Sequence, residues 1–304
     1  MSSAPSGKRA ISAGAFATLL LIALMMGANH VAARIAFNNG VDVATAVVVR
    51  SAVTALVVGG LLLTARVRWL TTARHKRFLL VIGLLIGVQS LCLYSAVARL
   101  PVALALLAFN TYPLWTALWD RLLYQRRPER ATLQAMPVIL VGLALALDVF
   151  GAASGLGAAG QWARIGAGVA FALAAAATFG LALVLTQHET TGIDGRMRTA
   201  STMMLAGLVA LTVVGAQGGM HLPVATAGWW GLGALTLLYG TAFTIMFTVL
   251  PKLGVAGNSA IMNVEPVFAL ALAWLILGQT IAPIQVAGAL LVVAAVMLLG
   301  LRKK

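Results

Sequence analysis

The chain has 304 residues, of which 61% are hydrophobic and only 9% are charged, and its mean hydropathy is +0.99. Soluble domains carry about 25% charged residues, so a chain this poor in charge cannot cover a water-facing surface, and a soluble globular fold is excluded. The formal net charge of +14 does not indicate a nucleic-acid-binding protein, because the basic residues gather in alternate breaks between apolar stretches.

Apolar stretches long enough to cross a bilayer, which takes about 20 residues, recur along the whole chain. The first follows Lys8 and Arg9 as a signal peptide would, but it runs for about 25 residues and has a counterpart in the second half, so we interpret it as a retained helix. The predicted fold is therefore an all-α integral membrane protein of about ten spanning helices. In chain order we predict helices over residues 13–37, 43–65, 78–98, 101–124, 131–150, 163–187, 198–217, 226–250, 255–277 and 283–301.

The positive charges divide unequally between the breaks. Counting breaks alternately from the N-terminus, seventeen Lys and Arg residues fall in one set and only Arg34, Arg99 and Arg164 in the other, with Arg50 inside a predicted span. This follows the positive-inside rule, so we expect both termini in the cytoplasm and an even number of spans. Contact with anionic lipid explains the basic loops, and no nucleic-acid partner is expected.

An internal repeat appears when the chain is moved along itself by 153 positions. Matches between Leu or Ala residues carry little information in so apolar a sequence, but rarer residue types also coincide. Each half then holds five spans, and an odd number forces the second half into the membrane in the opposite orientation, as in many secondary transporters. We predict two inverted five-helix repeats, residues 1–152 and 153–304. The informative pairs are Gly27 with Gly180, Gly87 with Gly240, Asn110 with Asn263 and Pro113 with Pro266.

The best block of the repeat resembles a known family. The run from Asn263-Val264-Glu265-Pro266 to Leu277-Gly278-Gln279 resembles the penultimate helix of EamA-type members of the drug/metabolite transporter superfamily, and Asn110-Thr111-Tyr112-Pro113 is a weaker copy. The resemblance covers essentially the whole chain and implies ten helices and small-molecule transport, with the YddG-type exporters of aromatic amino acids as the nearest group. The family often has Glu where this chain has Gln279, so no coupling role carries over to that position.

The two Asn-x-x-Pro blocks predict where the substrate site lies. Pro113 and Pro266 each remove a backbone amide near mid-helix, and carbonyls freed in this way survive in a membrane only against protein or a wet cavity. We therefore predict hinges at both prolines and a central cavity between the repeats. The same residues could instead serve only as interhelical hydrogen-bonding groups. The predicted lining residues are Asn29, His30, Tyr94, Asn110, Tyr112, Tyr239, Phe243, Met262, Asn263 and Glu265.

Three charged or titratable residues within predicted spans require partners. Glu265 is the only acid deep in a span, where an ionised carboxylate costs about 2.5–3.5 kcal/mol on insertion scales. It either exchanges protons during transport or stays neutral in a hydrogen bond, and the sequence leaves both open. For His30 we favour an interhelical hydrogen bond over substrate contact. For Arg50 we favour an ion pair with Asp42 or Asp148 over contact with a substrate carboxylate.

Two further residue types have simpler interpretations. Trp69, Trp162, Trp229 and Trp230 lie near predicted helix ends, where tryptophans anchor spans at the membrane interface. Cys92 lies within an apolar run and is the one cysteine of the chain, so no internal disulfide can form and we expect a packed thiol.

These features predict a secondary transporter of the bacterial inner membrane that exports amino acids, foremost aromatic ones, by alternating access. The chain shows no P-loop, zinc motif or Ser/His/Asp arrangement, so we expect no catalytic residue, cofactor or metal. The expected partners are a small amphiphilic metabolite and membrane lipid, and a monomer is compatible with this reading. The alternatives are a multidrug or quaternary-ammonium exporter, a channel subunit, and a lipid-modifying enzyme, which would need His, Asp or Glu clustered at one membrane face.

Overall fold

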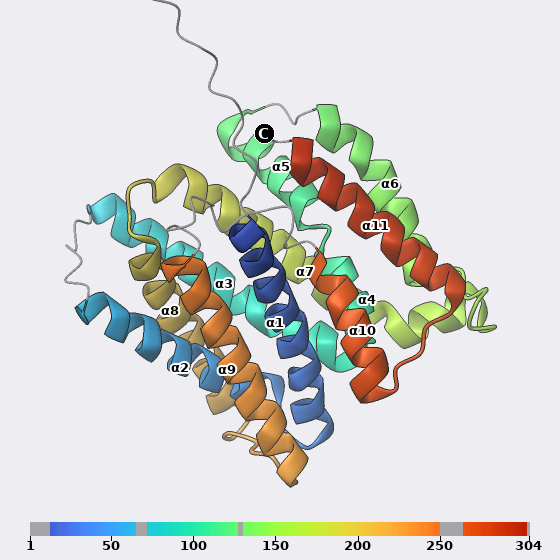
Figure 1. Ribbon diagram of the computed structural model, residues 1–304, viewed down its shortest axis with the longest axis horizontal. Helices are drawn as coiled ribbons and strands as arrows, with labels where there is room; N and C mark the ends of the chain where they lie inside the picture. Colours follow the sequence, from blue (N-terminus) through green and yellow to red (C-terminus); the bar gives the residue numbers. More distant parts are fainter. Residues whose placement is uncertain (1–12, 65–71, 127–129, 250–263, 303–304) are drawn as a thin grey trace, which may run out of the picture.

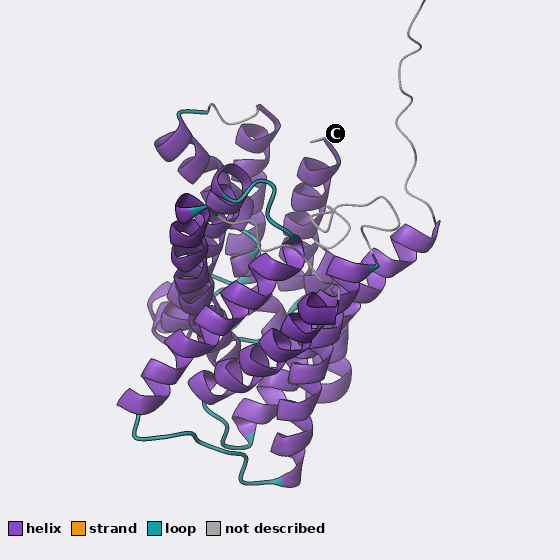
Figure 2. Ribbon diagram, turned by 90° about the vertical axis from the view of Figure 1, so that its left-hand side faces the viewer, coloured by secondary structure: helices purple, strands orange, loops and turns teal. Residues whose placement is uncertain are grey.

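The structure is a computed structural model of the chain that describes residues 13–64, 72–126, 130–249 and 264–302. All regular secondary structure in these ranges is helical (Figure 2). The helices are α1 (Ala13–Asn38), α2 (Val43–Thr64), α3 (Ala73–Arg99), α4 (Val102–Phe109), α5 (Tyr112–Tyr124), α6 (Arg130–Ala146), α7 (Gly157–Glu189), α8 (Gly195–Ala216), α9 (Thr226–Thr248), α10 (Glu265–Leu277) and α11 (Pro283–Arg302).

The span predicted over residues 101–124 corresponds to the apolar segment Val102–Tyr124, but its helix is not continuous. The chain forms two helices there, because α4 ends at a cap on Asn110 and α5 begins at Tyr112. Pro113 lies in the first turn of α5, where a missing amide leaves no helical hydrogen bond unmade. The proline therefore starts a new helix instead of bending a continuous one.

Most of the chain is suited to a membrane by length and composition. Within the described ranges, seven segments are long and apolar enough to span, with α4 and α5 counted as the single segment Val102–Tyr124. Three apolar helices are shorter, at Leu133–Ala146, Glu265–Leu277 and Pro283–Leu298, so the count of ten spans stays a prediction. Large apolar side chains such as Leu275 and Trp230 are 73% and 76% exposed, as is expected of a surface that faces lipid.

The predicted repeat is visible in the helices. α5 and α10 begin and end 153 residues apart, and α6 and α11 begin at Arg130 and Pro283, again 153 apart. Packing follows the same relation: α1 packs against α9 and α10, as α7 packs against α3 and α5. α6 and α11 lie side by side (Figure 1). The division at residues 152 and 153 falls between α6 and α7 and stays a prediction.

One pair of helix crossings repeats at the level of single atoms. A Cβ built on Gly27 in α1 would lie 3.0 Å from the Ala269 nitrogen of α10. A Cβ built on Gly180 in α7 would lie 2.9 Å from the Thr116 nitrogen of α5. Gly27 and Gly180, and Thr116 and Ala269, are each 153 positions apart. Small residues allow membrane helices to approach closely, so the predicted pairing of these two glycines marks equivalent contacts.

Successive loops lie at opposite ends of the molecule. At one end Val224 donates its amide to the Asn39 carbonyl over 3.0 Å, and Gln279 accepts from the Val102 amide over 3.1 Å. At the other end, which we call the basic end, Arg74 of α3 and Tyr124 of α5 both contact Glu189 of α7. α4 lies between the ends and is buried from Val102 to Ala108, where it packs against α3, α7 and α10.

Candidate functional site

A group of polar and aromatic side chains lies buried between helices of both repeats, and we call it the central cluster. Such groups are rare inside membrane proteins and usually mark a functional site. Its members come from α1, α2 and α3 of the first half and from α9 and α10 of the second. They are Asn29, His30, Arg50, Ser90, Tyr94, Tyr239, Phe243 and Glu265.

The contact between His30 and Glu265 joins α1 to α10. The His30 Nε2 atom lies 3.3 Å from the Glu265 Oε1 atom, with the two side chains 3% and 22% exposed. Gly27, one turn before His30, allows this approach, because a Cβ there would lie 3.1 Å from the Glu265 carbonyl. Positions three apart on a helix share a face, so Gly27 and His30 both face α10. The close approach of the two helices at Gly27 therefore positions His30 against Glu265.

Tyr94 forms the middle of the cluster. Its hydroxyl donates to the Asn29 Oδ1 atom over 2.9 Å, and its ring meets that of His30 edge-on with centroids 5.7 Å apart. The ring is fully buried and also packs edge-on against Phe37. Tyr94 thus connects the first two predicted site residues to α3.

The predicted ion pair between Arg50 and an aspartate is wrong. Arg50 instead lies between two tyrosine rings, with its guanidinium carbon 4.7 Å from the Tyr94 centroid and 4.0 Å from the Tyr239 centroid. Its Nη2 atom donates to the Ser90 hydroxyl over 2.9 Å. Arg50 is 3% exposed, so the guanidinium is enclosed by aromatic faces.

The two aspartates have partners in loops. Asp42 accepts from the Thr45 hydroxyl and amide and lies 3.3 Å from the His221 Nδ1 atom. Burial raises the pKa of Asp42, but these hydrogen bonds outweigh it and the pKa lies below its usual value. Asp148 accepts from the amides of Ala153 and Ser154, which lower its pKa. Both carboxylates therefore stabilise loops outside the spans.

Two groups of aromatic rings pack within the helical bundle. Tyr239 and Phe243 of α9 lie with centroids 4.5 Å apart. Phe109, Tyr112 and Phe179, which we call the aromatic trio, lie 5.2 to 5.7 Å from one another.

The remaining predicted site residues divide into two groups. Asn110 is buried at the break between α4 and α5, and its Nδ2 atom has no partner among the described residues. Pro266 lies in the first turn of α10, as Pro113 does in α5. The hinge role of these prolines stays a prediction. Met262 and Asn263 lie outside the described residues.

A histidine and two acidic residues lie close together at the basic end. Glu189 there accepts from the Tyr124 hydroxyl over 2.6 Å and lies 2.7 Å from Arg74. His188 lies 2.9 Å from Asp120 and stacks on the Tyr124 ring at 3.9 Å between centroids. These contacts join α3, α5 and α7, and each of the five side chains is engaged with another of the group.

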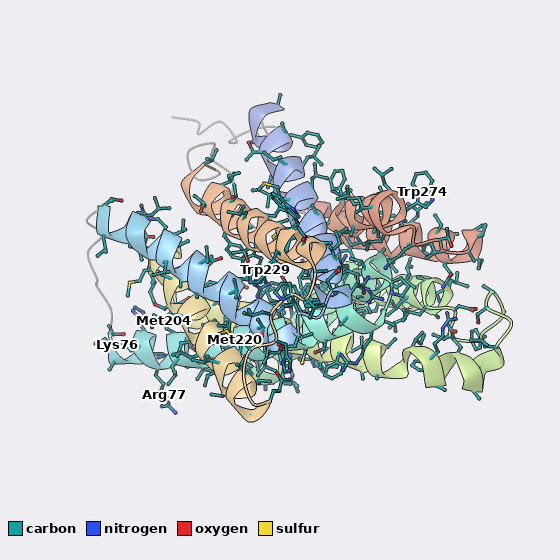
Figure 3. The ribbon with its side chains drawn as sticks, turned by 90° about the horizontal axis from the view of Figure 1, so that it is seen from below. Lys76, Arg77, Met204, Met220, Trp229 and Trp274 are labelled. Carbon is teal, nitrogen blue, oxygen red and sulfur yellow. The ribbon has the colours of Figure 1, made fainter. Side chains whose placement is uncertain are left out.

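Other polar residues within spans have structural roles. Arg34 donates to the carbonyls of Val97 and Leu100 over 2.6 and 3.3 Å, and so caps the end of α3. Cys92 is a partly buried free thiol packed against the core, as predicted. Trp229, near the start of α9, is 52% exposed (Figure 3), which agrees with an interfacial position.

A pocket opens on the outer surface at α10 and α11. Its walls include Leu270, Trp274 and Val286, and Trp274 points away from the molecule (Figure 3) with 62% of its surface exposed. The lining is almost entirely apolar and contains none of the central cluster. The pocket therefore fits an acyl chain of the bilayer better than a polar substrate.

The feature that the sequence did not indicate is the arrangement of the two tyrosines around Arg50. Arg50 could be recognised as unusual, because its partner in the repeat, Met203, is apolar. Which side chains surround it depends on the packing of α2 against α3 and α9, to which no short motif corresponds.

Comparison with known proteins agrees with this architecture. The EamA-like transporter family matches the chain twice, over residues 13–147 and 166–301, while no curated protein matches it. A solved crystal structure of a protein 18% identical to this chain is similar with a TM-score of 0.59, covering 96% of this chain and 99% of that one, and shows the fold alone. The two matches span most of the chain and correspond to its two repeats. The chain is a multi-pass membrane transporter of the drug/metabolite transporter superfamily, and it belongs to the EamA-like transporter family.

Proposed function

We propose that this transporter exports amino acids, foremost aromatic ones, across the bacterial inner membrane, and that its central cluster is the substrate site. The observation that carries this proposal is the composition of the cluster. It combines a cation, Arg50, an acid, Glu265, and the ring of Phe243, which packs against that of Tyr239. A zwitterion with an aromatic side chain offers one complement to each of these groups.

The position of the cluster supports alternating access. Its side chains come from helices of both halves, and the halves contact each other through the equivalent crossings at Gly27 and Gly180. In transporters built from inverted repeats, movement of one repeat against the other exposes a site between them to each side in turn. The predicted cytoplasmic termini make the basic end the inner face.

The geometry favours this reading over export of quaternary ammonium ions. Such ions bind against aromatic faces or carboxylates. Here the faces of Tyr94 and Tyr239 already carry the guanidinium of Arg50, which would repel a second cation. The side chains at the basic end do not support a lipid-modifying enzyme, because the charged groups there pair with one another.

The test is uptake of labelled phenylalanine, tryptophan and tyrosine into liposomes that contain the purified protein, with protein-free liposomes as the control. We expect saturable uptake that excess unlabelled aromatic amino acid blocks. Uptake no faster than in protein-free liposomes, by protein shown to be folded, would contradict the proposal. Tetraethylammonium uptake under the same conditions would favour the cationic-drug alternative.

A further inference from the structure

Arg50 is a buried cation for which the described part of the chain supplies no anion. Six of the seven acids are described, and every one has another partner; Glu129 lies outside the described residues. The partners are Thr45 and His221 for Asp42, His188 for Asp120, the Ala153 and Ser154 amides for Asp148, Arg74 and Tyr124 for Glu189, Arg196 for Asp194, and His30 for Glu265.

The contacts that Arg50 makes do not give every N–H donor of its guanidinium an acceptor. A guanidinium carries five N–H donors and stays charged at any accessible pH. Nη2 donates to Ser90, but the buried Nε atom has no partner among the described residues. Two tyrosine rings stabilise the charge. A buried charge normally has both a counter-ion and satisfied hydrogen bonds, and the described residues give Arg50 no counter-ion and leave its Nε atom without an acceptor.

A second buried donor near Arg50 is also unused. Tyr94 contacts both Arg50 and Asn29, through its ring and its hydroxyl respectively. The Asn29 Oδ1 atom accepts from that hydroxyl, which leaves the buried Nδ2 atom without a partner among the described residues. Two unused donors next to the same tyrosine suit a ligand that is rich in acceptors, and a carboxylate has two oxygens and no donor.

We infer that Arg50 binds the carboxylate of the transported substrate, an assignment that rests on the proposed function and names the group that the site selects. A guanidinium can donate to a carboxylate through its N–H groups, and such charge-assisted hydrogen bonds are strong. The Nη2 atom donates to Ser90, and the Nε atom is a donor that a carboxylate can use. Arg50 is thus a specificity-determining residue, and a substrate amide or amine without the carboxylate is a poor ligand.

The experiment removes the carboxylate from the ligand and the guanidinium from the protein in turn. Competitors of labelled phenylalanine uptake in liposomes are phenylalanine, 3-phenylpropionate, which lacks the amine, and phenylalaninamide, which lacks the carboxylate. In the wild-type protein we expect phenylalaninamide to compete at least about 30-fold more weakly than phenylalanine, as for loss of one partner of a buried charge pair. In Arg50→Gln we expect unlabelled phenylalanine to compete more weakly than in the wild type by a similar factor. Phenylalanine and phenylalaninamide should then differ by no more than about threefold as competitors.

Arg34→Gln is the matched control, because Arg34 is an arginine within a span that caps backbone carbonyls. It should keep the preference for the carboxylate. Arg50→Lys keeps the charge but loses the planar set of N–H donors, and it replaces Arg50→Gln in the test if that variant does not fold. Its preference for phenylalanine over phenylalaninamide should be intermediate. Equal competition by phenylalanine and phenylalaninamide in the wild type, or an unchanged preference in the folded Arg50 variants, would overturn the inference.

A binding measurement separates this inference from the proposed function. We expect 3-phenylpropionate to raise the melting temperature of the wild-type protein in detergent, because a ligand that binds only the folded state stabilises it, and to leave that of Arg50→Gln or Arg50→Lys less changed. Stabilisation without phenylalanine uptake would support the carboxylate site and contradict amino-acid export. Uptake of phenylalanine with equal competition by its amide would support export and contradict the role of Arg50.

Discussion

At the scale of single residues, Glu265 and His30 form the one titratable pair within the central cluster, 3.3 Å apart. Glu265→Gln keeps the size and hydrogen-bonding capacity of the side chain but cannot release a proton. If the pair exchanges protons during transport, we expect uptake to slow by about tenfold, which is about 1.4 kcal/mol in the barrier, and its pH dependence to flatten. The measurement is the initial rate of phenylalanine uptake from pH 5 to pH 8.

The control for this variant is Glu189→Gln, the same substitution at the basic end outside the central cluster. It should leave the shape of the pH profile unchanged. Full activity and an unaltered pH profile in Glu265→Gln would contradict proton exchange by the pair. Its role would then be structural, as a hydrogen bond that joins α1 to α10.

The hydroxyl of Tyr94 gives a prediction about stability. Tyr94→Phe keeps the ring against Arg50 and Phe37 but removes the donor to the buried Asn29 Oδ1 atom. A buried acceptor left without its donor costs about 1–3 kcal/mol, so the variant should melt at a lower temperature in detergent. A melting temperature equal to that of the wild-type protein would show that this hydrogen bond contributes no net stability.

At the scale of helices, the equivalent crossings at Gly27 and Gly180 should respond alike to the same substitution. An added Cβ would lie 3.0 Å or closer to backbone nitrogens of α10 and α5, which cannot move aside as a side chain can. Overpacking of this kind costs about 1–3 kcal/mol, so Gly27→Ala and Gly180→Ala should each lower the melting temperature. Gly27→Ala should also impair transport, because that crossing positions Glu265 against His30.

Gly60→Ala is the control, since Gly60 lies in α2 with no atom within 4 Å of an added Cβ. Replacing a helical glycine with alanine in open space stabilises a helix by up to about 1 kcal/mol. Wild-type stability in both crossing variants would contradict the close packing of α1 on α10 and of α7 on α5.

The helices were more predictable than their breaks. Long apolar runs and the 153-residue offset predict where α2, α9 and α11 lie, because lipid exposure demands apolar residues along a whole span. The break at Asn110 was predicted only as a bend, because Asn-x-x-Pro fits both a kinked helix and a helix that restarts at the proline. Tertiary packing around the buried α4 decides between them.

The residues that meet in the candidate site were predictable in part for a similar reason. Polar residues within spans are few, so Asn29, His30, Tyr94 and Glu265 could be named from the sequence, and the structure brings them together. The side chains around Arg50 could not be named from the sequence, since opposite charge was the only guide and it pointed to the two aspartates. Those lie in loops, where amide and hydroxyl donors satisfy them.

At the scale of the whole molecule, the unequal distribution of basic residues predicts orientation. Arg74, Arg196 and Arg198 belong to the rich set and Arg34 and Arg99 to the poor one, so the basic end should face the cytoplasm. We expect a green fluorescent protein fused to the C-terminus to fluoresce, and alkaline phosphatase inserted after residue 219 to be active. The reverse pattern would place the termini outside and make the basic end the outer face.

The central claim is that a site between the two repeats binds an aromatic amino acid and opens to each side in turn. Counterflow tests it most directly: liposomes containing the purified protein are loaded with unlabelled phenylalanine, and entry of external labelled phenylalanine is followed. Alternating access predicts faster entry into loaded than into empty vesicles, with a transient excess of label inside, and weaker stimulation in Arg50→Gln. Entry that is the same in loaded, empty and protein-free liposomes, with the protein shown to be folded, would contradict the account.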